Sequence, residues 1–151
     1  MNDDKTRQIL DATHYATIST VDKEGSPWAA PVWYTLDDSN NIYWWSAKTS
    51  QHSMNIKSDP KCYITIFDST LPEGKGVGLY IRAEAFEIND DSEIDSAIDL
   101  YNNTTEVFKL KIGDCTGKAP TRIYKAIPRK VWINSEAEVD GQYVDTRKML
   151  A

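Results

Sequence analysis

The residues best suited to chemistry lie in one short segment, SAKTSQHS, at positions 46–53. Its hydroxyl, amide and imidazole side chains surround one ammonium group, that of Lys48, and a short helix is expected to begin within it. The first turn of a helix exposes unpaired N–H groups and the positive end of the helix dipole, which together attract anions. A phosphate monoester suits such a set of donors. The candidate phosphate ligands are Ser46, Lys48, Thr49, Ser50, Gln51 and His52.

The same segment also fits a purely structural interpretation. In that interpretation Thr49 or Ser50 is the N-cap of the helix and Lys48 is solvated. The residue types alone do not decide between a helix cap and a phosphate site, so both interpretations stay open at this point.

Three other chemistries lack the residues they need. A serine hydrolase would use His14 or His52 as its base, but the chain has no GxSxG motif to present a nucleophile. The two cysteines, Cys62 and Cys115, stand alone without a zinc-ligand pattern and are expected to be reduced thiols. No GxGxxG sequence follows a strand, which argues against a Rossmann dinucleotide site.

Composition predicts a single domain over residues 1–151. With 17 basic and 23 acidic side chains the formal charge is −6, which is unfavourable for binding nucleic acid. No apolar run approaches the ~20 residues of a membrane helix, and the N-terminus lacks the pattern of a signal peptide. The expectation is a soluble, cytoplasmic protein that binds neither nucleic acid nor membrane.

Alternating apolar residues and turn signals predict a mainly β protein. The expected strands are 15–21, 28–36, a strand that begins at 42, 62–69, 78–88, 121–134 and 143–150. The expected helices are 3–14, 49–59 and 90–103, whereas 71–78 is a loop and 104–119 is ambiguous. Pro128 interrupts a strand as at an edge or a bulge. Short antiparallel strands with two or three packed helices indicate a closed or partly open barrel.

The strand at 42–45, IYWW, lacks the alternation of a strand with one wet face. Trp33 and Tyr34, on the preceding strand, repeat this feature. An antiparallel barrel packs one face inward and keeps its outer face polar. The outer aromatic side chains therefore need a cover, which a second subunit, a helix or a flat ligand can provide.

The order of these elements resembles the pyridoxamine 5′-phosphate oxidase-like, FMN-binding split-barrel family, from about residue 8 to 148. Two stretches carry the resemblance: residues 26–69, with the Ser/Thr-rich corner after the aromatic strand, and residues 123–134, IYKAIPRKVWIN. The resemblance implies a six-stranded antiparallel split β-barrel and a homodimer with two FMN molecules between the subunits. The partner chain and the isoalloxazine edge would then cover the outward aromatics of 33–45.

The resemblance also implies roles for individual residues. The phosphate of FMN would be held by Ser46 and by residues 48–52. The pyrimidine edge of the flavin would meet the backbone of Pro31, Val32, Trp33 and Tyr34. Trp132 of the partner would pack beside the ring, although ordinary core packing is an equal alternative. Arg147 would reach a flavin oxygen or the phosphate, or else form a surface ion pair with Asp145.

The sequence departs from true pyridoxamine phosphate oxidases at two places. Gln51 and His52 stand where those enzymes carry an Arg-Lys pair, and the C-terminal segment GQYVDTRKMLA lacks their substrate-binding arginine and histidine motif. FMN binding survives these departures, but pyridoxamine phosphate as the substrate becomes doubtful.

The leading functional hypothesis is an FMN-dependent oxidoreductase of unknown substrate, with two-electron chemistry at the flavin and a donor such as NAD(P)H. A deazaflavin-dependent reductase is one alternative, although Lys48, Lys75 and Arg82 are few cations for its longer anionic tail. A non-catalytic flavin-binding or stress-response protein is another. A haem-binding role ranks last, since only His14 and His52 are available as axial ligands.

Overall fold

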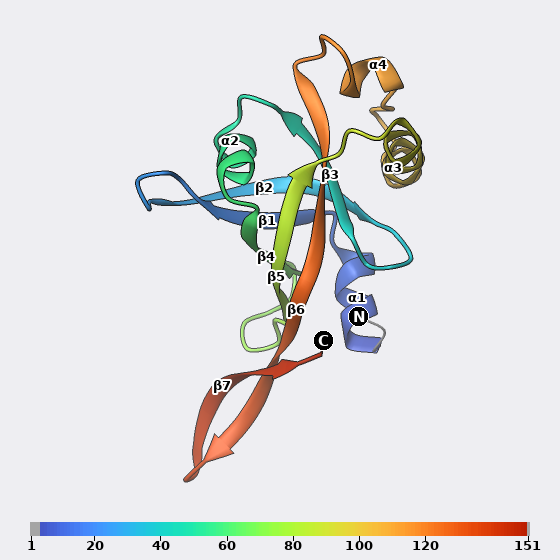
Figure 1. Cartoon of the computed structure of the whole chain (residues 1–151). Coiled ribbons are helices and arrows are strands. Elements are labelled where there is room, and N and C mark those ends of the chain that lie inside the picture. Colours follow the sequence, from blue (N-terminus) through green and yellow to red (C-terminus); the bar gives the residue numbers. More distant parts are fainter. Residues whose placement is uncertain (1–3, 151) are drawn as a thin grey trace.

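Six antiparallel strands close into a barrel in the computed structural model, which describes residues 4–150 except for the side chains at positions 136, 138, 143 and 145 (Figure 1). The strand order is β3-β2-β1-β4-β5-β6, and pairing of β3 with β6 closes the barrel, while β7 extends β6 as a hairpin. The strands are β1 Tyr15–Val21, β2 Pro27–Leu36, β3 Ile42–Ala47, β4 Lys61–Phe67, β5 Gly78–Glu87, β6 Thr121–Val139 and β7 Gln142–Met149. The predicted six-stranded split barrel is confirmed.

Alternate residues of the strands fill the barrel interior. Ile18, Ile64 and Ile81, from three neighbouring strands, are fully buried. Trp44 is also fully buried, and its ring stacks on that of Tyr124 at a centroid distance of 5.7 Å. Burying apolar side chains of this size contributes roughly 1.5–3 kcal/mol each. The interior is therefore a packed core, so any ligand site must lie outside it or at its ends.

Four helices lie within residues 4–150, rather than the two or three expected: α1 Asp4–Ala12, α2 Gln51–Ser58, α3 Asp91–Thr104 and α4 Ile112–Cys115. Ile9 of α1 and Ile56 of α2 join the same buried cluster as the barrel interior. None of the helices in this described range is long and apolar enough to cross a membrane.

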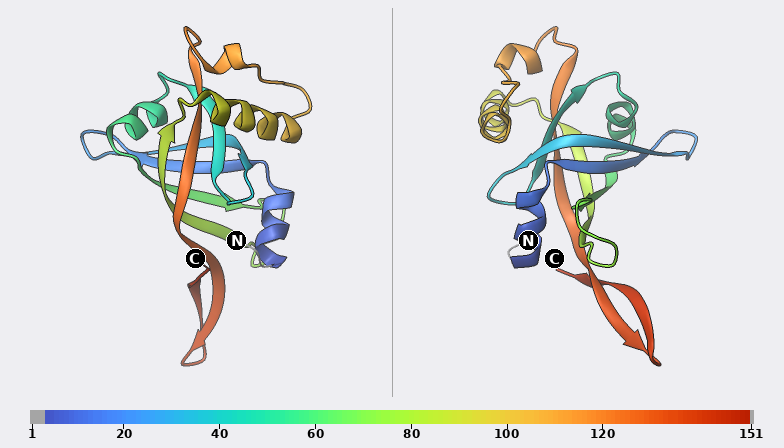
Figure 2. Two further views of the ribbon diagram at one scale, coloured as in Figure 1. Left: turned by 45° about the vertical axis from the view of Figure 1, so that its right-hand side comes forward. Right: turned by 180° about the vertical axis from the view of Figure 1, so that it is seen from behind.

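The outer face of β3 is covered by α3, which lies across the barrel wall beside it (Figure 2). Tyr43 is buried in a second apolar cluster with residues of α3, among them Ile94 and Ile98. Trp45 packs against this cluster and stacks on Phe108 at 5.2 Å. Within this chain α3 supplies the cover, and an additional cover by a partner subunit and a flavin stays a prediction.

Trp33 on β2 is also covered from within the chain. Its indole stacks on the ring of His14 at 4.7 Å, and its Nε1 lies 3.4 Å from Thr104 Oγ1 at the end of α3. Trp33 thus has a partial cover from within the chain, and a second subunit over it stays a prediction.

Pro128 lies at an irregularity of the β5–β6 pairing, as predicted. Arg82 pairs with Lys130 while its neighbour Ala83 pairs with Pro128, so Arg129 is the extra residue of a bulge. A proline has no N–H to donate, and a bulge is a place where the ladder does not require one.

Candidate functional site

The ladder between β2 and β3 is short, and its early end creates the opening of the split barrel. It contains the pairs Leu36–Ile42 and Tyr34–Trp44 and ends there. Beyond this point residues 31–33 pair only with β1, and residues 45–47 pair only with β6. Each segment therefore has one edge without ladder partners, and we call the two facing segments the split. Backbone N–H and C=O groups along such edges are available to a polar ligand.

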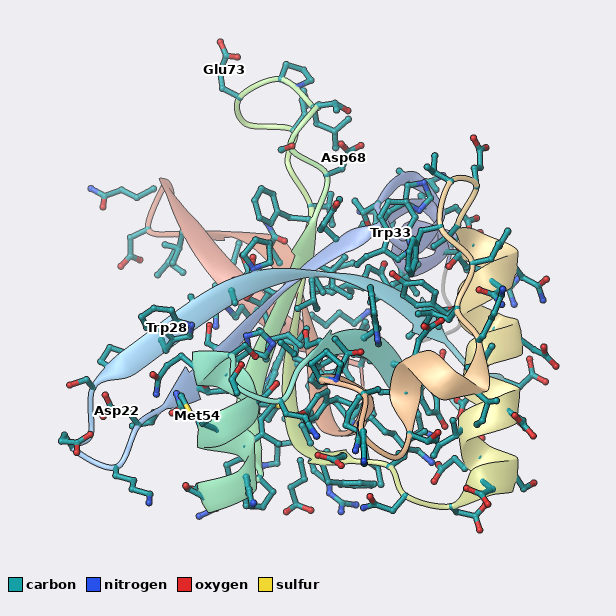
Figure 3. All side chains as sticks on the ribbon, turned by 90° about the horizontal axis from the view of Figure 1, so that it is seen from above. Asp22, Trp28, Trp33, Met54, Asp68 and Glu73 are labelled. Atoms are coloured by element: carbon teal, nitrogen blue, oxygen red, sulfur yellow. The ribbon has the colours of Figure 1, made fainter. Side chains whose placement is uncertain are left out.

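The split leads from the α2 side of the molecule to the α3 side. Figure 3 shows Trp28 of β2 beside Met54 of α2, and Trp33 of the same strand on the side where α3 ends. The helix α2 begins four residues after β3 ends. The unpaired edges and the start of this helix are thus parts of one region.

The first turn of α2 has no side-chain cap. Ser50 has the extended backbone of an N-cap, with φ −65° and ψ 148°, but its side chain makes no capping hydrogen bond. Its hydroxyl instead donates to the carbonyl of Ala47 at 2.9 Å. The first helical bond runs from Met54 N–H to Ser50 C=O, so the N–H groups of 51–53 have no intrahelical acceptor. Ser50 thus stands at the expected cap position and leaves the helix start open to an anion.

His52 connects the hydroxyls of this corner. The side chain is buried, and its Nε2 lies 2.9 Å from Ser46 Oγ and 3.1 Å from Ser50 Oγ. Ser50 Oγ is also 2.8 Å from Ser53 Oγ, a residue of the same segment that the sequence analysis did not single out. Burial lowers the pKa of His52 below its usual 6.5, so the ring is neutral at pH 7. The predicted residues Ser46, Ser50 and His52 form one hydrogen-bonded network.

Lys48 and Thr49 lie at the exposed rim of the corner. The N–H of Lys48 donates to the carbonyl of Pro120 at 2.9 Å, which fixes the rim to the segment before β6. Gln51 differs from its prediction, because its side-chain amide donates to Asn55 Oδ1 at 2.8 Å. It is therefore oriented along the helix, and Gln51 offers the corner its backbone N–H only.

A second cation near the corner was missed from the sequence. Arg122 of β6 pairs directly with Ser46 of β3, and its guanidinium is mostly buried. It is held by Glu87, with Nε and Oε1 3.2 Å apart, and by the carbonyls of three neighbouring residues, among them Ala119 at 2.9 Å. No sequence motif marks it, since its place depends on the β3–β6 register. Because the donors of Arg122 are occupied, the ammonium of Lys48 is the cation more available to a ligand.

Of residues 31–34, which are predicted to contact the flavin through their backbone, residues 31–33 have an edge without ladder partners. The side chains of Val32 and Tyr34 point into the barrel core. Pro31 is exposed, and it lies in the stretch of β2 that pairs with β1 alone. Tyr34 forms the last ladder pair with Trp44, so the split itself begins at Trp33.

Trp132 and Arg147 lie far from this corner in the same chain. Trp132 pairs with Tyr80, and the Arg147 guanidinium lies 3.8 Å from the centroid of that tyrosine ring. Arg147 also donates to Tyr63 Oη at 3.0 Å. Along β6, Trp132 is about 33 Å from Arg122 at ~3.3 Å per residue. A site that contains both Lys48 and Trp132 needs two chains, and the predicted ion pair of Arg147 with Asp145 falls outside the described side chains.

Comparison with solved structures shows the same fold in proteins of low sequence identity. A heme-binding protein from Mycobacterium smegmatis has a TM-score of 0.71 and 19% identity over 94% of this chain. This chain spans only 56% of that protein's length. The heme storage protein HutZ from Vibrio cholerae has a TM-score of 0.68 and 14% identity, with 84% of this chain and 90% of that chain covered. A FAD-binding protein from Mesorhizobium loti has a TM-score of 0.62 and 15% identity, with 85% and 89% covered.

Sequence comparison places the chain in a family. No curated protein matches it. The family that matches is described as pyridoxamine 5′-phosphate oxidase, and the match covers residues 3–135. This range contains the whole barrel core, the split and the open start of α2. The chain therefore belongs to the pyridoxamine 5′-phosphate oxidase family.

Proposed function

We propose that this protein binds FMN and acts as an FMN-dependent oxidoreductase on a small molecule. The observation that carries the proposal is the open first turn of α2 at the end of the split. A flavin mononucleotide combines a flat ring with a polar edge and a phosphate. The split offers unpaired backbone groups, and the helix start offers unpaired N–H groups.

The residues present fit the phosphate of FMN. The N–H groups of 51–53, the hydroxyls of Ser46, Thr49 and Ser50, and the ammonium of Lys48 would hold it. Charge-assisted hydrogen bonds of this kind contribute about 1.5–3 kcal/mol each. The backbone of residues 31–33 would meet the pyrimidine edge of the ring. When bound, FMN supplies two-electron transfer at its ring, and the chain supplies orientation and exclusion of water.

The proposal includes a homodimer. The surface that supports it is the outward face of the barrel strands, rather than the aromatics of 33–45. Ten neighbouring outward positions on five strands carry uncharged side chains, and the guanidinium groups of Arg82 and Arg147 border them over the rings of Trp132 and Tyr80. These positions, which we call the uncharged face, are Tyr15, Thr17, Ser19, Ala29, Pro31, Tyr63, Thr65, Phe67, Tyr80 and Trp132. Tyr15 is 60% exposed and Phe67 is 52% exposed. Solvated sheet faces are normally polar, and large exposed apolar patches usually mark interfaces.

The uncharged face contains both Pro31, at the split, and Trp132, in the middle of β6 and far from the split. A second copy seated on this face would therefore bring its Trp132, and Arg147 next to it, towards the split of the first copy. This arrangement accounts for the separation of these residues within one chain. It also makes the cofactor site depend on dimer formation.

The visible absorption spectrum of the purified protein, titrated separately with FMN and with haem, tests the proposal. We expect one FMN per chain with a perturbed flavin spectrum and no Soret band at stoichiometric haem. Haem is the informative competitor, because two proteins of similar fold are named for it and because His14 is exposed beside the split. A Soret band that shifts in a His14→Ala variant, with no binding of FMN, would overturn the proposal. A deazaflavin is recognised by its own absorption band.

Enzyme activity is separated from flavin storage by anaerobic reduction of the bound flavin with NADH and with NADPH. Bleaching of the flavin band within seconds and its return with oxygen support an oxidoreductase. A band that neither nucleotide bleaches favours a storage role. Pyridoxamine 5′-phosphate is expected to be a poor substrate, because Gln51 and His52 replace the Arg-Lys pair of the true oxidases.

A further inference from the structure

We propose that His52 is a positioning residue that makes phosphate binding at this corner depend on pH, with affinity rising as His52 takes up a proton. The inference rests on the proposed FMN site and goes beyond it by assigning a sign to the pH dependence and a single residue to its cause. His52 acts through its charge and through the hydroxyl of Ser46, and it does not itself contact the ligand.

The hydrogen bonds explain how a proton on His52 reaches the ligand. Nε2 lies within 3.1 Å of both Ser46 Oγ and Ser50 Oγ. Each hydroxyl has one proton, and a proton donated to an unprotonated Nε2 cannot also be donated to a phosphate. The Ser50 proton goes to the Ala47 carbonyl, so Ser46 is the hydroxyl that an Nε2 without a proton would hold as donor. The imidazolium carries a proton on Nε2 and donates it, so Ser46 can direct its own proton to the phosphate. Proton uptake therefore adds a positive charge beside the helix start and frees the Ser46 proton for the phosphate.

The charged groups around His52 leave its ring without a counter-charge in the free protein. The first turn of α2 has no acidic residue. On β6, opposite Ser46, stands Arg122, which is paired with Glu87 of β5, so that these two charges offset each other. Tyr124, whose pKa burial raises, interacts with Ser53 of the same helix, and Lys48 is exposed at the rim.

A bound phosphate supplies the missing counter-charge. Burial lowers the pKa of His52 in the free protein, and a nearby dianion raises it again. Binding is then linked to proton uptake. The gain in affinity begins as the pH falls through the pKa of the bound form. It is complete below the pKa of the free form, which lies under 6.5.

The experiment measures the Kd of FMN by flavin fluorescence quenching, for the full chain and for a His52→Gln variant, from about pH 8 to about pH 5.5 at constant ionic strength. The phosphate of FMN itself titrates near pH 6, but this contribution is common to both proteins. We expect the ratio of the Kd of His52→Gln to that of the parent to rise about tenfold as the pH falls, if the phosphate raises the pKa by one unit. Riboflavin, which has no phosphate, should give a ratio that does not change with pH.

A ratio for FMN that is the same at every pH overturns the role of His52 while leaving the FMN site intact. Equal affinities of the parent for FMN and riboflavin overturn the site itself, which is a different outcome. Should His52→Gln fail to fold, an NMR titration of the parent replaces it, because the chain has only two histidines and His14→Gln assigns the signals. The expected result is a higher pKa of His52 with FMN than without it, and an unchanged pKa contradicts the proposal.

Discussion

Ser50 occupies the N-cap position of α2, but its side chain does not cap the helix. It has the backbone conformation of an N-cap, yet its hydroxyl bonds to Ala47 and to Ser53 instead of to the helix. A helix start without a capping side chain keeps its N–H groups for another acceptor. This observation changes the balance between the two interpretations of the segment, because a simple cap would satisfy the helix by itself.

Replacing Lys48 by Met should weaken FMN binding about tenfold or more and change riboflavin binding by less than about twofold. The reason is that the ammonium would contact the phosphate and not the flavin ring. The difference should shrink as salt rises, since part of the attraction is screened. Fluorescence quenching at low and high salt measures both effects. Lys57→Met, an exposed lysine at the far end of the same helix, is the matched control and should bind FMN like the parent.

A Lys48→Met variant that binds FMN as tightly as the parent would place the decisive cation elsewhere. Arg147 of a second chain would be the next candidate. The open helix start would then act without Lys48, and the assignment of the rim residues would be wrong.

Residue types indicated which hydroxyl and imidazole side chains come together at this corner, but not every side-chain orientation. Ser46, Ser50 and His52 are brought together as their spacing around a strand end and a helix start suggests. The Gln51 side chain does not join this group, because its amide donates to that of Asn55 one helical turn later. Arg122 was missed because a partner across two strands has no signature along the chain.

At the scale of elements, strong local patterns predicted their segments closely. β1 has the predicted bounds, 15–21, because apolar residues alternate along it and a turn with Gly25 at φ 85° follows. α4 was not predicted, since its four residues are too few for a helical period. The segment before it is held by tertiary contacts, among them the side chain of Asn102, which bonds both the N–H and the C=O of Leu110.

The spacing of apolar residues predicted α3 but not its place. Ile94 and Ile98 lie on one face of the helix, as expected. Which surface this face covers depends on the long connection from β5, and the sequence alone does not show that it folds back over Tyr43. The sequence predicted that these aromatics need a cover, but it left open whether a helix, a second subunit or a ligand supplies it.

The cap of α3 gives a prediction about stability. The Asp90 carboxylate accepts from the N–H of Glu93 at 2.9 Å, so Asp90→Ala should cost about 1 kcal/mol. For a chain of this length that corresponds to a Tm lower by about 2–4 °C. Asp95→Ala removes the same charge from an exposed position within the helix and should leave the Tm nearly unchanged. Equal Tm values for the two variants would show that the cap contributes nothing, and calorimetry measures both.

Assembly of the whole molecule into a dimer, as proposed, depends on the uncharged face. The sequence suggested a dimer because of the aromatics at 33–45, but α3 covers Tyr43 and Trp45 and the end of α3 reaches Trp33. The strands β1, β4 and β5 supply the better argument. Their outward side chains are mostly hydroxyls and aromatics, which as single residues attract no notice, and only the strand register gathers them into one surface.

Thr65→Lys places a charge at the centre of the uncharged face, between Thr17 and Tyr80. We expect sedimentation velocity to give a dimer for the parent and the 17.1 kDa monomer for the variant. FMN affinity should fall with the dimer, because Trp132 of the second copy is lost. Ser96→Lys, on the exposed side of α3, should stay dimeric. A parent that is monomeric at micromolar concentration would remove both the interface and the two-chain site.

The most direct test of the central claim compares the affinities of the unmodified protein for FMN and riboflavin. The two flavins share the ring and differ in the phosphate, so their ratio isolates the open start of α2 and its hydroxyls. Two or three charge-assisted bonds at about 1.5–3 kcal/mol each predict that FMN binds at least about 100-fold more tightly. Equal affinities in a fluorescence titration at neutral pH would contradict the account, because the corner at 46–53 would then be only the connection between a strand and a helix.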